Sequence, residues 1–176
     1  TADDVDLARR LTAAHDALHF MLVPAAVTTA WSVEQVSALL AACTAARRPL
    51  TFRSGGTSLS GQAQSDSLLV DTRRGFRRVE VLDDGRRVRV EPGAVLRSVN
   101  ARLVPHGHRL GPDPASEAAC TVGGVVANNS SGMTCGTESN AYRTVESMQV
   151  VLASGTVVDT AAADADDDLR AREPAV

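Results

Sequence analysis

The chain of 176 residues contains no lysine and no isoleucine, so all of its 18 basic side chains are arginines. Codons for lysine and isoleucine are rich in A and T, and their absence indicates a GC-rich coding sequence. Without lysine the chain cannot build a Walker loop, which needs that residue after its glycines. The 21 acidic side chains outnumber the basic ones, and a net charge of −3 argues against a general nucleic-acid-binding protein.

Cysteines are few, and long apolar runs are missing. Cys43, Cys120 and Cys135 are odd in number and lack C-x-x-C spacing. This pattern argues against a disulfide framework, a zinc site or an iron–sulfur cluster, and we predict no metal site. No apolar run approaches the roughly 18 residues that cross a bilayer, and the N-terminal stretch is acidic and amphipathic. We therefore expect no membrane span, no signal peptide and a reducing cytoplasm as the location.

The remaining composition, 44% hydrophobic and 22% charged, is typical of a globular domain. Apolar periodicity predicts helices over residues 3–18 and, after the capping pair Ser32 and Gln35, up to about Ala46. Apolar and β-branched runs predict strands over 25–29, 49–53 and 68–71. Strands that alternate with a helix in this way favour a small parallel α/β unit.

After residue 75 the pattern changes to alternating residues on either side of a turn. This predicts a hairpin over 79–91, then a helix from about 95 that ends before Gly107. Residues 107–147 show no long periodic segment, and a second hairpin is predicted over 148–158. Seven arginines fall between residues 73 and 89, and we interpret them as the solvated surface of the first hairpin.

The first segment rich in glycine, RSGGTSLSGQ at residues 53–62, directly follows a predicted strand. Glycines accept positive φ angles and let a ligand approach the backbone, so their N–H groups can form a nest for an anion such as phosphate. The hydroxyls of Ser54, Thr57 and Ser58 add further donors. The alternative interpretation is a plain surface turn.

The second segment runs from GPDPAS at 111–116 to CTVGGVVANNSSG at 120–132. Apolar residues alternate there with glycines and a polar Asn-Asn-Ser-Ser cluster, which suits a backbone packed against a large planar ligand. Three of the four asparagines in the chain lie between residues 128 and 140, beside the only tyrosine. The alternative interpretation is an irregular structural loop.

Together, and in this order, the segments resemble the FAD-binding PCMH-type domains of the vanillyl-alcohol oxidase and p-cresol methylhydroxylase family. The resemblance spans about residues 18–160 and is closest to the D-lactate, glycolate and D-2-hydroxyglutarate dehydrogenase branch. It implies an α+β fold with a small parallel α/β lobe (about 20–72) and a second lobe with a mixed or antiparallel sheet and helices (about 75–160). The separate C-terminal substrate domain of the family is expected to be absent from this chain.

The resemblance also implies the residues that hold FAD. Residues of the first segment would wrap the pyrophosphate: Arg53, Ser54, Gly55, Gly56, Thr57, Ser58, Gly61 and Gln62. Residues of the second would line the flavin and its ribityl chain: Pro112, Asp113, Ser116, Thr121, Gly123, Gly124, Asn128, Ser131 and Gly132. Val150 would meet the adenosine side. Thr57 stands where covalent relatives have histidine, and the pattern around Cys120 differs from theirs, so non-covalent FAD is expected.

The implied activity is oxidation of a small 2-hydroxy acid to a 2-oxo acid by hydride transfer to FAD. Electrons would then pass to a quinone, cytochrome or iron–sulfur partner. Family base residues lie on the other domain, so no catalytic residue is named and this chain alone is expected to be inactive. Alternatives are a sugar or alcohol oxidase of the same fold, or a non-catalytic nucleotide-binding module. Peripheral association with the inner face of the membrane is left open.

Overall fold

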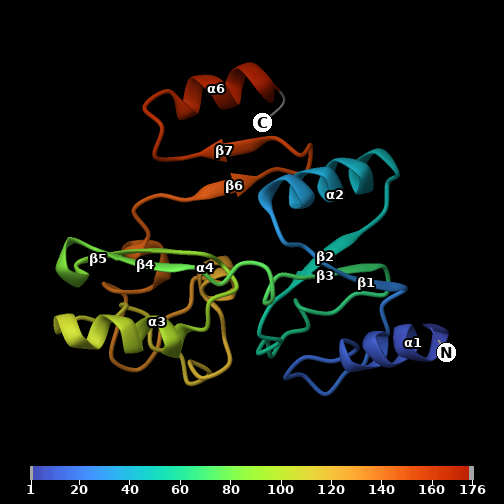
Figure 1. The fold of residues 1–176 in the computed structure, drawn as a ribbon, viewed down its shortest axis with the longest axis horizontal. Helices are drawn as coiled ribbons and strands as arrows, with labels where there is room; N and C mark the ends of the chain where they lie inside the picture. The colour runs from blue at the N-terminus through green and yellow to red at the C-terminus, as the bar shows by residue number, and fades with distance from the viewer. Residues whose placement is uncertain (1, 175–176) are drawn as a thin grey trace.

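The computed structural model describes residues 2–174. Its first part comprises helix α1 (Ala2–Thr12), strand β1 (Ala26–Thr29), helix α2 (Val33–Ala45), strand β2 (Leu50–Arg53) and strand β3 (Leu68–Asp71). The three strands form a parallel sheet with β3 in the centre. The predicted parallel α/β unit is therefore confirmed, with α1 and α2 on opposite sides of the sheet in Figure 1.

Helix α2 begins as its capping pair predicts. The Ser32 hydroxyl accepts a hydrogen bond from the backbone N of Gln35, and the Gln35 side chain in turn accepts one from the backbone N of Trp31. Apolar residues of α2 then pack on the sheet around Val70 and Phe76. This packing forms the core of the first part of the molecule.

Helix α1 is shorter than its apolar periodicity predicts, because it ends at Thr12 rather than at residue 18. Beyond that point the backbone bonds to distant partners: the N–H of Ala17 donates to the carbonyl of Ser58, and that of Leu22 to the carbonyl of Ala14. These tertiary bonds replace the helical ones and turn the chain under the first glycine segment.

The second part is built on antiparallel hairpins and short helices. Its elements are β4 (Val79–Leu82), the 3-10 turn η1 (Asp83–Gly85), β5 (Arg87–Val90), α3 (Leu96–Leu103), the 3-10 turn η2 (Val104–His106), α4 (Val122–Ala127), α5 (Ala141–Thr144), β6 (Gln149–Val151), β7 (Val157–Asp159) and α6 (Ala165–Arg172). Strands β4 and β5 pair with each other, as do β6 and β7, and both predicted hairpins are confirmed. Two of the short helices, α4 and α5, lie in the region where no periodic segment was expected.

The core of the second part lies between α3 and its neighbours. Val99 and Leu103 of α3 pack against the apolar face of the β4–β5 hairpin, while Leu96 packs with Cys120 and Val125. The β6–β7 hairpin turns back to the first part, where the Ser37 hydroxyl of α2 donates to the carbonyl of Gly155. Figure 1 shows this hairpin between α2 and α6.

Candidate functional site

The first glycine segment leaves the parallel sheet at the carboxyl end of β2. Within residues 2–174, no acceptor is found for the backbone N–H groups of residues 54–59, and the next N–H, that of Ser60, donates to the Ser58 hydroxyl at 3.2 Å. Residues 54–58 are half-buried and Leu59 is exposed, so these six donors can bond to solvent or to a ligand. Such a run is suited to bind an anion.

Hydrogen bonds from neighbouring residues fix the position of the segment. Besides the bond from Ala17 to the Ser58 carbonyl, the Arg53 guanidinium donates to the carbonyl of Ala63 at 3.2 Å. The Ser58 hydroxyl contacts the Gln62 side-chain oxygen. Both ends of the segment are therefore fixed without use of the N–H groups of residues 54–59.

Gly56 needs to be glycine for a reason within the chain. Its φ of +66° lies in the left-handed region, which favours glycine, whereas the atom nearest to a Cβ there is the movable end of the Arg53 side chain. Gly61, with φ of +78°, is also left-handed. These conformations shape the loop before any ligand is considered.

Asp16 is a buried residue of this region that sequence reasoning missed. One carboxylate oxygen accepts from the backbone N of Leu18 and from the Gln64 side chain, each at 2.9 Å. The other oxygen has no partner among the described residues, although Asp16 is only 7% exposed. The only sequence signal is an aspartate inside an apolar stretch, where it closes a turn onto Leu18.

The two glycine segments meet in space. The hydroxyls of Ser54 and Thr121 form a short hydrogen bond, and Thr121 is 1% exposed. A Cβ on Gly55 would lie 2.4 Å from the carbonyl oxygen of Ala119, so only glycine allows this close approach. The structure therefore brings together the parts of the chain that the sequence places 67 residues apart.

Glycines of the second segment divide into two kinds. A Cβ on Gly123 would lie 2.6 Å from Pro92, and one on Gly132 would lie 2.0 Å from the Asp113 carboxylate, so both are required by packing. A Cβ on Gly124 would meet only Thr121 Oγ1, at 3.9 Å. Gly124 is exposed in α4, and nothing in the described structure requires a glycine there. Its bare surface is therefore free to contact a ligand.

Asp113 anchors the loop that follows. Its carboxylate accepts hydrogen bonds from the Thr134 hydroxyl and from the backbone N–H groups of Thr134 and Cys135. These bonds, the hydroxyl first, lower the pKa of Asp113 below its ordinary value. The carboxylate thus holds residues 132–135 in place, in addition to any contact with a ligand.

The polar cluster after α4 supports local structure. The Asn128 side chain accepts from the Ser130 hydroxyl at 2.5 Å, while that of Asn129 accepts from the backbone N of Tyr142 at 3.0 Å. Asn140 caps α5. Two of the three clustered asparagines therefore position α5, a role that the sequence did not reveal.

The remaining predicted site residues all belong to the second part of the molecule. Pro112 is buried, Ser131 is exposed, and the Ser116 carbonyl accepts from the N–H groups of Ala119 and Cys120, both at 2.8 Å. Val150 lies on β6, whose hairpin bonds to α2, and Figure 1 shows that hairpin apart from α4.

Cys120 is 5% exposed and packs with Leu96, Val125 and Ala141. Burial raises the pKa of its thiol. A protonated thiol in an apolar cluster is a packing group rather than a nucleophile. Thr57 stands at the position expected to be histidine in covalent relatives, and its side chain has no nitrogen that could attack the flavin.

A parallel three-stranded sheet, antiparallel hairpins and two glycine segments that meet between them define a flavin-binding domain of the PCMH type. A profile of the FAD binding domain family matches residues 24–161, and the chain belongs to this family. The predicted family and fold class are thereby confirmed.

Curated relatives include the glycolate oxidase subunit GlcD of Escherichia coli strain K12, 41% identical over 64% of this chain and 23% of its own length. D-2-hydroxyglutarate dehydrogenase of Pantoea ananatis is 34% identical over 87% of this chain and 15% of its own length. D-lactate dehydrogenase of Archaeoglobus fulgidus is 31% identical over 72% and 28%. The chain therefore spans less than a third of the length of these relatives.

Solved structures share the fold. Chitooligosaccharide oxidase superposes with a TM-score of 0.74 and 22% identity, over 92% of this chain and 34% of its own. Glucooligosaccharide oxidase from Acremonium strictum, whose FAD is 6-S-cysteinyl and 8α-N1-histidyl, gives 0.67 and 26% over 83% and 30%. Within residues 2–174, no helix is long and apolar enough to cross a membrane.

Proposed function

We propose that the chain is the FAD-binding part of a flavin-dependent dehydrogenase that oxidises a small 2-hydroxy acid of the D-lactate or glycolate type to the 2-oxo acid. The observation that carries the cofactor role is the run of N–H groups at residues 54–59 that have no acceptor in the described part of the chain, together with the open surface of Gly124. The relatives with 31–41% identity, named as hydroxy-acid enzymes, favour this substrate class over sugars.

In this proposal, residues 54–59 bind the pyrophosphate through backbone N–H groups, with the hydroxyls of Thr57 and Ser58 as further donors. The Ser54–Thr121 bond fixes the distance between that nest and the second segment. Gly124, without a side chain, lets the ring system lie against α4. FAD, when bound, would supply the acceptor for the hydride of the hydroxyl-bearing carbon, while residues of this chain would hold and orient it. Donors fixed in advance lower the entropy lost on binding.

The remaining predicted contacts belong to the same proposal: Arg53, Gly55, Gly61, Gln62, Pro112, Asp113, Ser116, Asn128, Ser131, Gly132 and Val150. We also propose an electron-accepting partner, a quinone, a cytochrome or an iron–sulfur protein, and a two-lobe division at about residues 72–75. The three cysteines are free in the structure, which supports a reducing cytoplasm as the location.

The cofactor assignment is tested by calorimetry with FAD and FMN. FMN lacks the pyrophosphate that the nest would hold, so FAD is expected to bind more tightly, and equal or tighter binding of FMN would refute the assignment. The substrate class is tested on the complete gene product. Under anaerobic conditions, D-lactate or glycolate should bleach the flavin absorbance. If only an oligosaccharide bleaches it, the protein is assigned to the sugar oxidases of the same fold.

A further inference from the structure

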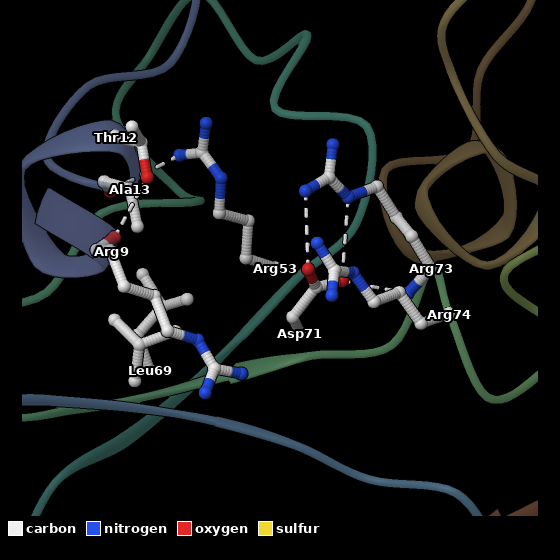
Figure 2. Close-up of a pocket in the computed structure, with 9 residues that line it drawn as sticks. Arg9, Thr12, Ala13, Arg53, Leu69, Asp71, Arg73 and Arg74 are labelled. Carbon is white, nitrogen blue, oxygen red and sulfur yellow. Dashed lines mark hydrogen bonds and ion pairs between the residues drawn. The ribbon is translucent and has the colours of Figure 1, made fainter. Parts of the chain in front are cut away.

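A cavity of about 300 Å³ lies between the end of α1 and one face of the parallel sheet, beside the glycine loop (Figure 2). Its lining combines arginines with a small apolar floor. The lining residues are Arg9, Thr12, Ala13, Val27, Arg53, Leu69, Asp71, Arg73 and Arg74. Four arginines and one aspartate are among these residues, so the lining carries an excess of positive charge.

The sheet register explains why these side chains converge. Thr29 and Arg53, the last residues of β1 and β2, are both paired with Asp71 at the end of β3. Paired residues of neighbouring strands point to the same face of a sheet. The carboxyl end of the sheet therefore presents polar groups toward α1, while Val27 and Leu69 form the floor two residues earlier.

The charges are only partly balanced within the chain. Asp71 accepts from Arg73 through both carboxylate oxygens, at 3.3 and 3.1 Å, so its charge is already engaged. Arg9 donates to the Thr29 hydroxyl at 2.7 Å, a neutral partner. Among the residues whose side chains the structure describes, none forms a hydrogen bond or ion pair with Arg74.

The surroundings of Arg53 disfavour its positive charge. Its guanidinium is half-buried and donates only to carbonyl oxygens, those of Ala63 and Ala13 at 3.2 and 3.5 Å. Burial, and after it the charge of Arg73, lowers the pKa of Arg53, and the nearby carboxylates of Asp16 and Asp71 offset this only in part. A second cation next to a desolvated cation is unfavourable, and a bound anion would add to the compensation that these two carboxylates provide.

An apolar groove adjoins the cavity. A wider hollow of about 670 Å³ shares Arg9, Thr12 and Arg74 with it and adds Val5, Ala8 and Trp31. Trp31 is 58% exposed. A molecule with an anionic head and an organic remainder could occupy both at once, the remainder lying against the indole.

We propose that this cavity is a phosphate-binding site separate from the flavin nest. Guanidinium groups match phosphate oxygens in pairs, and the excess of arginines suits a dianion better than the single charge of a simple carboxylate. The phosphate can be free or carried by an organic ester. Arg53 of β2 belongs both to this cavity and to the predicted FAD contacts, whereas Arg9, Arg73 and Arg74 line the cavity alone. The proposed flavin nest binds through the backbone N–H groups of residues 54–59.

The test uses Trp31, the single tryptophan of the chain, as a reporter. Inorganic phosphate and phenyl phosphate are titrated at constant ionic strength, with acetate as a comparison. Saturable binding of phosphate, and weaker binding of acetate, is expected. Tighter binding of phenyl phosphate than of inorganic phosphate assigns an organic ester, and equal binding assigns free phosphate. Absence of saturable phosphate binding, or acetate binding as tight as phosphate, overturns the proposal.

Arg74→Ala is the decisive variant, because Arg74 forms no bond that the fold requires. It should weaken phosphate binding about tenfold or more, the loss of one charge-assisted hydrogen bond. Arg77→Ala is the matched control: it removes the same charge from an exposed residue three positions along that does not line the cavity. An equal loss in both variants would show general charge attraction and overturn the site.

Competition with FAD separates this site from the proposed function. FAD affinity, measured by calorimetry, should be the same with and without saturating phosphate, and the same in Arg74→Ala. Displacement of FAD by phosphate would make the cavity part of the flavin site and overturn its independence. If FAD does not bind at all while phosphate binding responds to Arg74→Ala, the proposed function fails and the phosphate site stands.

Discussion

The hydroxyl groups of Ser54 and Thr121 are hydrogen-bonded to each other, although Ser54 follows the parallel sheet and Thr121 precedes α4 in the other part of the molecule. Thr121 is buried, and its backbone bridges to Val95. The bond therefore links the glycine loop to a rigid point of the second core. It sets the spacing between the anion nest and the surface of α4.

Removal of this bond should reduce stability and FAD affinity together. Thr121→Val keeps the shape of the side chain but leaves the Ser54 hydroxyl without its partner, at a cost of about 1 to 2 kcal/mol. In a double-mutant cycle with Ser54→Ala, chemical denaturation should give a coupling energy of about 1 kcal/mol. Calorimetry should show weaker FAD binding in each single variant.

Thr51→Val is the matched control for this cycle. Thr51 lies in β2, and its hydroxyl has no hydrogen bond with the described residues. Valine is favoured in strands, so stability should stay within about 0.5 kcal/mol of the parent. A coupling energy near zero between Ser54 and Thr121 would mean that the contact does not join the two segments in solution.

Gly124→Ala should separate ligand binding from folding. Alanine is favoured over glycine inside a helix by about 1 kcal/mol, and the new methyl group meets only Thr121 Oγ1 at 3.9 Å. The variant should therefore be as stable as the parent or more stable. FAD affinity should nevertheless fall on the order of tenfold, about 1.4 kcal/mol, because the methyl group occupies ligand space.

Gly123→Ala provides the contrast. Its Cβ would lie 2.6 Å from Pro92, so this variant should lose about 1 to 3 kcal/mol of stability through overpacking. Thermal unfolding measures the stability of both variants, and calorimetry measures their FAD affinity. Unchanged FAD affinity in a folded Gly124→Ala protein would show that α4 does not face the cofactor.

The sequence predicts most of the fold because its signals are local. The capping pair at Ser32 and Gln35, the alternation in both hairpins and the apolar strands of the sheet all give the elements that the structure contains. The end of α1 is different. Ala14 and Ala17 continue a helical pattern, but tertiary bonds to residues 22 and 58 hold them outside the helix.

The site could be predicted as two segments but not as one assembly. Glycines at 55 and 56 indicate a loop. The close contact of Gly55 with the Ala119 carbonyl could not be predicted, because the two residues are far apart in the sequence. Helix α4 was missed because Gly123 and Gly124 have low helix propensity. It forms because the N–H groups of Val122 and Gly123 donate to the carbonyls of Ala94 and Pro92.

The cofactor should be released on denaturation. Thr57 offers no nucleophile for a histidyl-type bond, and Cys120 is buried in an apolar cluster with a raised thiol pKa. After reconstitution with FAD and acid precipitation, the yellow colour should stay in the supernatant. Flavin that remains with the washed pellet would contradict this, and a Cys120→Ser variant would then show whether the thiol is the point of attachment.

Asp113 should make stability depend on pH in the acid range. Hydrogen bonds from the Thr134 hydroxyl and two backbone N–H groups lower its pKa in the folded protein, while the unfolded chain retains an ordinary value of about 3.9. The unfolded state therefore takes up the proton more readily. The stabilisation is complete above the unfolded value and is lost as the pH falls through the lower native one.

Asp113→Asn tests this dependence, because the amide cannot carry the charge. Thermal unfolding should show a lower midpoint than the parent at pH 7, and the difference should shrink as the pH falls from about 5 to about 3. Asp66→Asn is the control, since the exposed Asp66 carboxylate forms no hydrogen bond with the described residues and its replacement should give a small difference at every pH. A difference for Asp113→Asn that stays constant across this range would mean that the carboxylate anchors residues 132–135 by shape alone and that its charge contributes nothing to the fold.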